Sequence, residues 1–310
     1  MLISIVIPVY KSSKSLEVLT EQVAKLAKQQ EEKFEIIFVN DSPWFLETRR
    51  SLEKVKATYK EAKVITLRKN QGQHLALLVG LSQAKGDYII TMDDDLQHPV
   101  SEIPKLINAI KNKADIDAVF AVPGYNKKKH SLWRNTGSYV LNKIDTLFLE
   151  KPKGLIKSPF RIITADLAMV VLKNYNAMPA LSSLIIKGTD NIININVSHN
   201  ERAYGRSNYS LRKLISLSLN NVLHYSSLPL KIVGFIGFSG LALSILFIAW
   251  TVFRKFFLGI TFPGYTSTVT LISFFGGLNL FAVGLIGEYL IRIIKEQQKV
   301  PLDNFIKKIK

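Results

Sequence analysis

The chain has 310 residues, with 41 Lys or Arg against 24 Asp or Glu, and a formal net charge of +17. It contains no cysteine, which excludes disulfide scaffolds, thiolate metal sites and cysteine nucleophiles. The basic excess is compatible with nucleic acid, an anionic membrane surface or a phosphorylated substrate as a partner.

Short apolar runs alternate with helix-length amphipathic stretches in the first part of the chain. The runs predict buried strands at 2–9, 34–39, 63–67, 87–92 and 116–122, and the stretches between them predict helices at 14–30, 46–60, 73–84 and 101–112. This alternation predicts an α/β fold, a mostly parallel sheet with helices on both faces. Farther along, 131–149 predicts a helix, and 158–164 and 191–198 predict strands.

Two long segments near the C-terminus lack charged side chains. Residues 232–253 and 265–287 each exceed the ~18–20 residues needed to cross a hydrocarbon core, so two transmembrane helices are expected. The N-terminus has only a strand-length apolar run with no basic flank, which fits neither a secretory signal nor an anchor. Because basic residues follow the second span, the positive-inside bias predicts that the catalytic domain and both termini are cytoplasmic.

Residues 209–228 have an apolar side and a polar side. This pattern favours an amphipathic helix on the membrane surface, and the alternative is a helix that packs in the core of the soluble domain. The expected organisation is a catalytic domain at 1–208, a juxtamembrane helix at 209–228, a two-helix transmembrane region at 229–288 and a basic tail at 289–310.

Three consecutive carboxylates, Asp93, Asp94 and Asp95, follow the strand predicted at 87–92. Like charges this close repel one another, so the fold needs a cation or hydrogen-bond donors to compensate them. Hard oxygen ligands suit Mg²⁺ or Mn²⁺, and such an ion shared with a diphosphate would neutralise charge on a phosphate leaving group. The alternative is a solvated acidic turn before a helix capped by Ser101.

Other polar positions follow neighbouring strands. Asp41 comes directly after the strand at 34–39, and the first strand ends at Pro8 and Tyr10. An Asx turn over Asn40–Pro43 would explain Asp41's surroundings without any function. Because parallel strands end at one rim, these positions and the acidic triplet are expected to meet there, which favours a nucleotide pocket.

Several motifs in consistent order resemble family 2 glycosyltransferases with the GT-A fold. They are Val6-Ile7-Pro8-Val9-Tyr10, Val39-Asn40-Asp41-Ser42, Asn70-Gln71-Gly72-Gln73, Ala84-Lys85-Gly86-Asp87-Tyr88 and Asp93-Asp94-Asp95-Leu96-Gln97-His98-Pro99. The Asp-Leu-Gln-His-Pro extension, the segment Glu201–Ser210 and the two C-terminal spans resemble the polyprenyl-phosphate branch, which includes dolichol-phosphate mannosyltransferases and bacterial undecaprenyl-phosphate sugar transferases.

The resemblance implies a role for each matching position. Pro8, Tyr10, Val39 and Asp41 would line the base and ribose of a sugar nucleotide, and Arg202 and Arg206 would close over its diphosphate. Asp93, Asp95 and Gln97 would hold the metal, with Asp94 facing the nucleotide or sugar, and Arg134 and Ser138 would bind the acceptor phosphate. The catalytic set is therefore Asp93, Asp94, Asp95 and Arg134. Asn40 stands where many relatives have Asp, and the element around Arg161 only partly matches the family.

The resemblance thus implies inverting transfer of one sugar from a nucleoside-diphosphate sugar, with UDP as the expected nucleotide, to undecaprenyl phosphate for cell-envelope glycan or lipopolysaccharide modification. The enzyme would be a multi-pass protein of the cytoplasmic membrane that can form homo-oligomers, and nucleic acid is not an expected partner. One alternative is transfer to a glycan or lipid hydroxyl, which needs a general base; another is a non-catalytic scaffold that binds anionic lipid.

Overall fold

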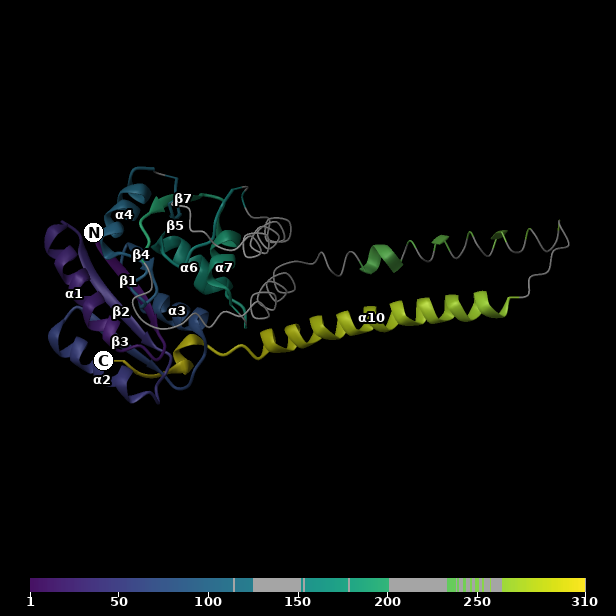
Figure 1. The fold of residues 1–310 in the computed structure, drawn as a ribbon, viewed down its shortest axis with the longest axis horizontal. Helices are drawn as coiled ribbons and strands as arrows, with labels where there is room; N and C mark the ends of the chain where they lie inside the picture. The colour runs from purple at the N-terminus through teal and green to yellow at the C-terminus, as the bar shows by residue number, and fades with distance from the viewer. Residues whose placement is uncertain are drawn as a thin grey trace. The chain divides into compact units, whose positions relative to one another are not determined.

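The computed structural model describes residues 1–113, 115–124, 152, 154–177, 179–200 and 264–309, with scattered positions between 233 and 257. The chain divides into two compact units, residues 1–218 with 299–310, and residues 219–298. The first unit holds the sheet and its covering helices, and the second contains the long helix α10, Tyr265–Gln297 (Figure 1).

Within the described residues, eight strands form one sheet in the order β7-β5-β6-β4-β1-β2-β3-β8 (Figure 1). The strands are β1 (Leu2–Val9), β2 (Lys33–Asn40), β3 (Ala62–Leu67), β4 (Tyr88–Thr91), β5 (Ala118–Pro123), β6 (Arg161–Thr164), β7 (Ile192–Val197) and β8 (Ile306–Ile309). Only β6 and β8 pair antiparallel with their neighbours, so the sheet is mixed but mostly parallel, as the alternating pattern predicts.

Helices pack on both faces of the sheet. They are α1 (Lys14–Gln29), α2 (Leu46–Thr58), α3 (Gln73–Ser82), the short η1 (Val100–Glu102) leading into α4 (Ile103–Lys111), α6 (Ala165–Asn174) and α7 (Leu181–Gly188). The central strand β1 serves both layers, because alternate side chains point to opposite faces. Ile5 and Ile7 join the core cluster formed with α1 and α4. Val6 faces Gly80 of α3, where an added Cβ would lie 2.2 Å from its Cγ1, so α3 approaches closely only because residue 80 is glycine.

The strands and helices predicted before residue 124 are all observed with small shifts at their ends. The helix predicted at 101–112 differs in its first turn, which is the η1 segment, and Ser101 does not cap α4, whose N-terminal flanking residue is Glu102. Helices α6 and α7 were not predicted. The helices predicted at 131–149 and 209–228 lie outside the described residues.

The end of the chain folds back onto the first unit. A short helical turn, η2 (Leu302–Phe305), precedes β8, which pairs antiparallel with β3 and becomes the edge of the sheet. The backbone N–H of Arg68 donates to Phe305 O at 2.8 Å, and its Nε donates to Asn304 O at 3.0 Å. Lys299 Nζ donates to Tyr175 O at 2.5 Å, which ties the tail to the domain at a second place.

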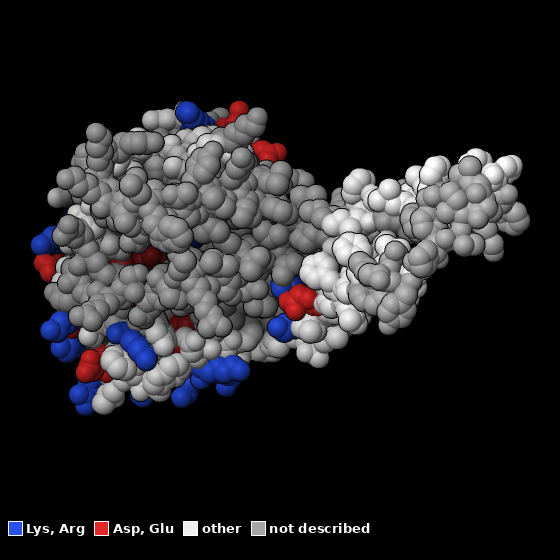
Figure 2. Space-filling view, turned by 45° about the vertical axis from the view of Figure 1, so that its right-hand side comes forward, with Lys and Arg blue, Asp and Glu red and all other residues white. Residues whose placement is uncertain are grey.

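Helix α10 contains the second predicted membrane span. Among the described residues, one helix is long and apolar enough to cross a membrane, over Phe274–Gln297. Its charged residues are confined to its C-terminal end, and the described side chains of the second unit are otherwise almost all uncharged (Figure 2). Of the first predicted span, 232–253, the structure describes scattered positions, and these, such as 233–237, are helical.

The strand order determines where a ligand can bind. The chain passes from β1 outward to β2 and β3, and then crosses back to β4 on the other side of β1. In open parallel sheets, a crevice forms outside the carboxyl ends of the strands where the order reverses in this way. Here that point lies between the ends of β1 and β4, which lead into Tyr10 and the acidic triplet.

Candidate active site

The acidic triplet lies directly after β4, at this reversal of strand order. One carboxylate oxygen of Asp94, Oδ2, is buried and has no hydrogen-bond partner among the described residues. The pKa of Asp94 is raised to about 7, mainly by burial and also by the charges of Asp93 and Asp95, while hydrogen bonds from the Ser12 side chain and the Tyr10 backbone oppose the shift. The triplet therefore concentrates negative charge that the protein's own donors compensate only in part.

A tight turn sets the direction of the triplet. Leu96 has φ of 61°, in the left-handed region that a branched residue rarely adopts, and Gln97 N donates to Asp95 Oδ1 at 3.1 Å. The end of the segment after β7 packs on this turn, because Asn200 N donates to Gln97 O at 3.0 Å. From α3, Gln73 Nε2 donates to Asp93 Oδ1 at 2.7 Å. Distant parts of the chain thus hold the carboxylates in place.

The Asp41 carboxylate is held by the loop between β3 and α3. Its Oδ1 accepts from Gln71 N at 2.6 Å, and its Oδ2 accepts from Asn70 Nδ2 at 2.7 Å and from Gly72 N at 2.9 Å. Gly72 has φ of 85°, a conformation that favours glycine, and it leads directly into α3. Burial raises the pKa of Asp41, and the two backbone N–H groups partly offset this effect. Asp41 therefore fixes the loop beside the rim.

The other residues expected to bind the nucleotide differ in their exposure. Tyr10 is 48% exposed at the rim, whereas Pro8 is buried and Val39 is fully buried, with its Cγ2 near Gly80 of α3. The Val39 side chain thus belongs to the core, and the residue is paired with β1 on one side and β3 on the other, so it does not line the rim as expected. The Asx turn considered as an alternative is present, since Ser42 N donates to Asn40 Oδ1 at 3.0 Å.

Arg161 is a buried cation beneath the rim. The family resemblance assigns it no role. It is 1% exposed, its Nε donates to Thr91 Oγ1 at 2.9 Å, and its Nη1 donates to Ser182 Oγ at 2.7 Å. Burial lowers the pKa of Arg161 to about 10, an effect opposed by the charge of Asp93, so it remains charged at neutral pH. Because Thr91 is the last residue of β4, Arg161 positions the strand that leads into the acidic turn.

His98 also supports the turn. Its ring stacks on Phe160 with centroids 5.1 Å apart, and its Nδ1 accepts a long, 3.4 Å hydrogen bond from Asp93 N. Burial lowers the pKa of His98 to about 4, so the ring is neutral at physiological pH and can act as an acceptor. These contacts give His98 a packing role beneath the turn.

The donor set at the turn fits a hard divalent cation. Asp93 and Asp95 supply carboxylates, Gln97 supplies an amide oxygen, and Asp94 Oδ2 is an unsatisfied buried acceptor. Within the described part of the chain, no group of three or more His, Cys, Asp or Glu could by itself hold a metal ion. Mg²⁺ and Mn²⁺ tolerate such a partial set, because they retain waters and share ligands with substrate phosphates.

The remaining predicted site residues lie outside the described part of the chain. These are the proposed acceptor-binding residues Arg134 and Ser138, and the proposed closing residues Arg202 and Arg206. Asn200, two residues before Arg202, contacts the acidic turn.

Solved structures show the fold class. Glucosyl-3-phosphoglycerate synthase from Mycobacterium tuberculosis, in complex with Mn²⁺, UDP and phosphoglyceric acid, superposes with a TM-score of 0.53 over 72% of this chain and 76% of that one, at 16% identity. The complex of the same enzyme with Mn²⁺, UDP-glucose and phosphoglyceric acid gives a TM-score of 0.52 at 15% identity, over 72% and 77% of the two chains. The fold and its acidic rim define an α/β protein of the GT-A type.

The family follows from the sequence comparisons. The model for glycosyl transferase family 2 matches residues 4–169, more than half of the chain. A Proteus mirabilis protein named undecaprenyl-phosphate 4-deoxy-4-formamido-L-arabinose transferase is 31% identical over 99% of this chain and 93% of its own length. A Pseudomonas syringae protein of the same name is 29% identical over 99% and 90%. The chain therefore belongs to glycosyl transferase family 2 and is a glycosyltransferase, as the motifs indicated.

Proposed function

We propose that this enzyme transfers one sugar, with inversion, from a UDP-linked donor to undecaprenyl phosphate, to supply a cell-envelope glycan or lipopolysaccharide modification. One observation carries the proposal. The acidic turn after β4 and the loop at 70–72, which hydrogen-bonds to Asp41, lie together at the point where the strand order reverses. The full-length similarity to relatives named undecaprenyl-phosphate sugar transferases supports the choice of acceptor.

The proposed chemistry depends on positioning rather than on a general base. The second pKa of a phosphate monoester is about 6, so the acceptor is already an anionic nucleophile at neutral pH. Rigid groups near the reacting centre lower the barrier by orienting the two substrates. Arg161, through Thr91, and Gln73, through Asp93, maintain the orientation of the carboxylates.

Asp93, Asp95 and Gln97 would hold a bound Mg²⁺ or Mn²⁺. When present, this ion stabilises negative charge on the departing diphosphate. Asp94 would face the nucleotide or sugar, Tyr10 and Asp41 would border the base and ribose, and Arg202 and Arg206 would bind the donor diphosphate. Arg134 and Ser138 would bind the acceptor phosphate, which guanidinium groups suit because of their paired donors.

The location follows from the acceptor and from α10. A lipid phosphate lies at the bilayer surface, and a helix able to cross the bilayer would keep the enzyme beside it. We therefore place the protein in the cytoplasmic membrane as a multi-pass enzyme with the catalytic domain and both termini in the cytoplasm. The amphipathic segment 209–228 would lie on the membrane surface.

A transfer assay tests this function. Membranes containing the protein would be incubated with radiolabelled undecaprenyl phosphate and a panel of nucleotide sugars, including UDP-4-deoxy-4-formamido-L-arabinose and UDP-glucose, and the lipids would be separated by thin-layer chromatography. One donor should produce a slower-migrating lipid product, and Asp95→Ala should abolish it while the protein stays folded in the membrane. No change in the migration of the labelled lipid with any donor, or full activity in Asp95→Ala, would contradict the proposal.

A further inference from the structure

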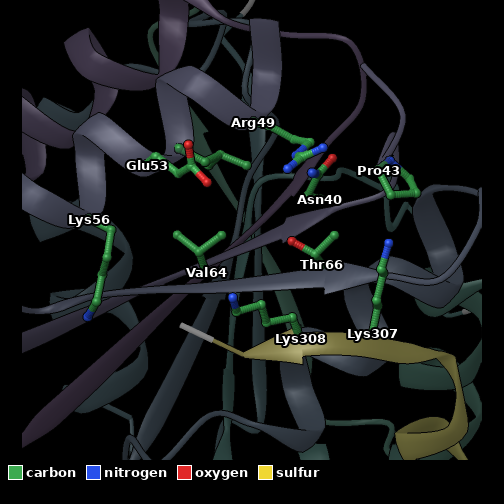
Figure 3. Close-up of a pocket in the computed structure, with 10 residues that line it drawn as sticks. Asn40, Pro43, Arg49, Glu53, Lys56, Val64, Thr66, Lys307 and Lys308 are labelled. Carbon is green, nitrogen blue, oxygen red and sulfur yellow. The ribbon is translucent and has the colours of Figure 1, made fainter. Parts of the chain in front are cut away.

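A basic cavity lies in the first unit between α2 and the edge of the sheet (Figure 3). Its volume is about 120 Å³, well above the ~10–15 Å³ that one water requires, so a group of several atoms fits. Arg49 and Lys56 contribute from α2, Thr66 from β3, and Lys307 and Lys308 from β8. The C-terminal strand therefore completes the wall.

The cavity wall includes a buried donor without a partner. Asn40 is 1% exposed, and its Oδ1 accepts from both the N–H and the hydroxyl of Ser42. Its Nδ2 is buried and has no hydrogen-bond partner among the described residues. A buried amide N–H without a partner lowers the stability of the fold, so a bound acceptor here would remove an existing penalty.

The charge of the wall favours an anion. Four cationic side chains line the cavity against the single carboxylate of Glu53. Asn40 and Pro43 lie at one end of the cavity. Figure 3 shows Arg49 at this end, and Lys307 extending toward it from β8. Lysines on an edge strand also discourage pairing between sheets, but this role does not explain the unpaired amide of Asn40.

This cavity is separate from the proposed donor site. Consecutive residues of an extended strand point to opposite faces of a sheet. The Asp41 carboxylate binds the loop at 70–72 before α3, whereas Asn40 lines the cavity beside α2. Among the described residues, none of those expected to bind the donor or the metal lines it.

We propose that this cavity is an anion site that binds a phosphate group, with Asn40 Nδ2, Arg49 and Lys307 as its main donors. The planar guanidinium group can donate two hydrogen bonds to a phosphate, and the ammonium group of Lys attracts phosphate oxygens by its charge. The ligand links β2 and α2 to β8, so its binding stabilises the docked C-terminal strand by mass action. The phosphate group comes either from free phosphate or from an anionic phospholipid headgroup.

The test measures the midpoint of thermal unfolding of the full chain in detergent, against inorganic phosphate at constant ionic strength set with NaCl. The midpoint should rise and saturate for the wild type. Arg49→Gln should weaken the apparent affinity at least tenfold, whereas Arg50→Gln, which neutralises the next residue of α2 outside the cavity, should behave as wild type. Asn40→Asp keeps an acceptor for Ser42 but places a carboxylate in the wall, so the phosphate response should disappear.

A second arm distinguishes the two sources of phosphate. Without added phosphate, the chain would be compared in nanodiscs of phosphatidylcholine alone and with phosphatidylglycerol. If the ligand is a headgroup, the phosphatidylglycerol discs should stabilise wild type and Arg50→Gln but not Arg49→Gln. If the ligand is soluble phosphate, the two kinds of disc should give the same midpoint, and only inorganic phosphate should raise it. A phosphate effect that persists unchanged in Arg49→Gln and Asn40→Asp, or no effect in either arm, would overturn the proposal.

Discussion

Asp41 shows how one buried carboxylate can organise a binding rim. Both of its oxygens accept hydrogen bonds from the loop at 70–72, two of them from backbone N–H groups. The loop in turn leads into α3, whose Gln73 donates to Asp93. Asp41 thus links the end of β2 to the loop after β3, and Gln73 extends this link to the end of β4.

We predict that Asp41→Asn destabilises this rim. Because both oxygens are used, the amide NH₂ must face one of the loop's donors, which leaves a buried pair unsatisfied at a cost of about 1–3 kcal/mol. The midpoint of thermal unfolding should fall by roughly 2–4 °C per kcal/mol, and the Kd for UDP should rise. Asp115→Asn, at an exposed loop position, serves as the control. Equal midpoints and Kd values for the two variants would contradict this role.

For single residues, the sequence predicted where the site residues lie in the fold better than which partners their side chains contact. The strand ends identified Tyr10, Asp41 and the acidic triplet as neighbours on one rim, because strand period and polarity are visible in the sequence. The motif Asn70-Gln71-Gly72-Gln73 also carried the resemblance, but nothing in it indicated that its N–H groups bind Asp41. Arg161 could not be assigned because its partners, Thr91 and Ser182, lie far away in the chain.

The C-terminal strand β8, like helices α6 and α7, is an element that the sequence pattern did not predict. Its four residues, Ile-Lys-Lys-Ile, are too short and too basic to resemble a buried strand, and their partner β3 lies about 240 residues earlier. Pairing over such a distance depends on tertiary contacts, here the Arg68 bonds to Asn304 and Phe305. Strands such as β1 and β5 could be predicted because their apolar runs are buried on both faces.

We expect removal of residues 306–310 to destabilise the catalytic domain. The deletion exposes the hydrogen-bonding edge of β3, which favours aggregation. The truncated protein should unfold at a lower temperature and elute partly as higher oligomers in gel filtration. The full-length Lys307→Gln/Lys308→Gln variant keeps the backbone pairing, so in phosphate-free buffer it should remain close to wild type. Identical behaviour of truncated and wild-type protein would show that β8 has no structural role.

At the scale of the whole molecule, the unit that holds the sheet is built from residues that come before the apolar helix α10 in the sequence and from residues that come after it. Residues 299–309 pack on the domain that residues 1–200 begin, whereas 265–297 form the apolar helix. A truncation of everything after residue 228 would therefore remove β8 together with the helices. A loss of activity in that truncated protein could then come from a folding defect or from the loss of membrane attachment, and the experiment would not separate the two causes.

We predict different effects on the two substrates when only residues 229–297 are replaced by a Gly/Ser linker. A linker of about 20 residues spans roughly 25 Å on average. The variant retains residues 299–310. UDP should bind with a Kd close to that of the wild type, while transfer to long-chain undecaprenyl phosphate in vesicles should fall at least tenfold. Equal losses of UDP binding and transfer would indicate that the helices are needed for folding rather than for lipid access.

We propose above all that the acidic turn after β4 binds the donor's diphosphate through a divalent ion. The most direct measurement is isothermal titration of the full-length protein with UDP, with and without Mn²⁺, for wild type and Asp95→Ala. We predict tight binding only for wild type with Mn²⁺, and a large loss of affinity either without the metal or in the variant. Binding that is equally tight in all four experiments would contradict the account.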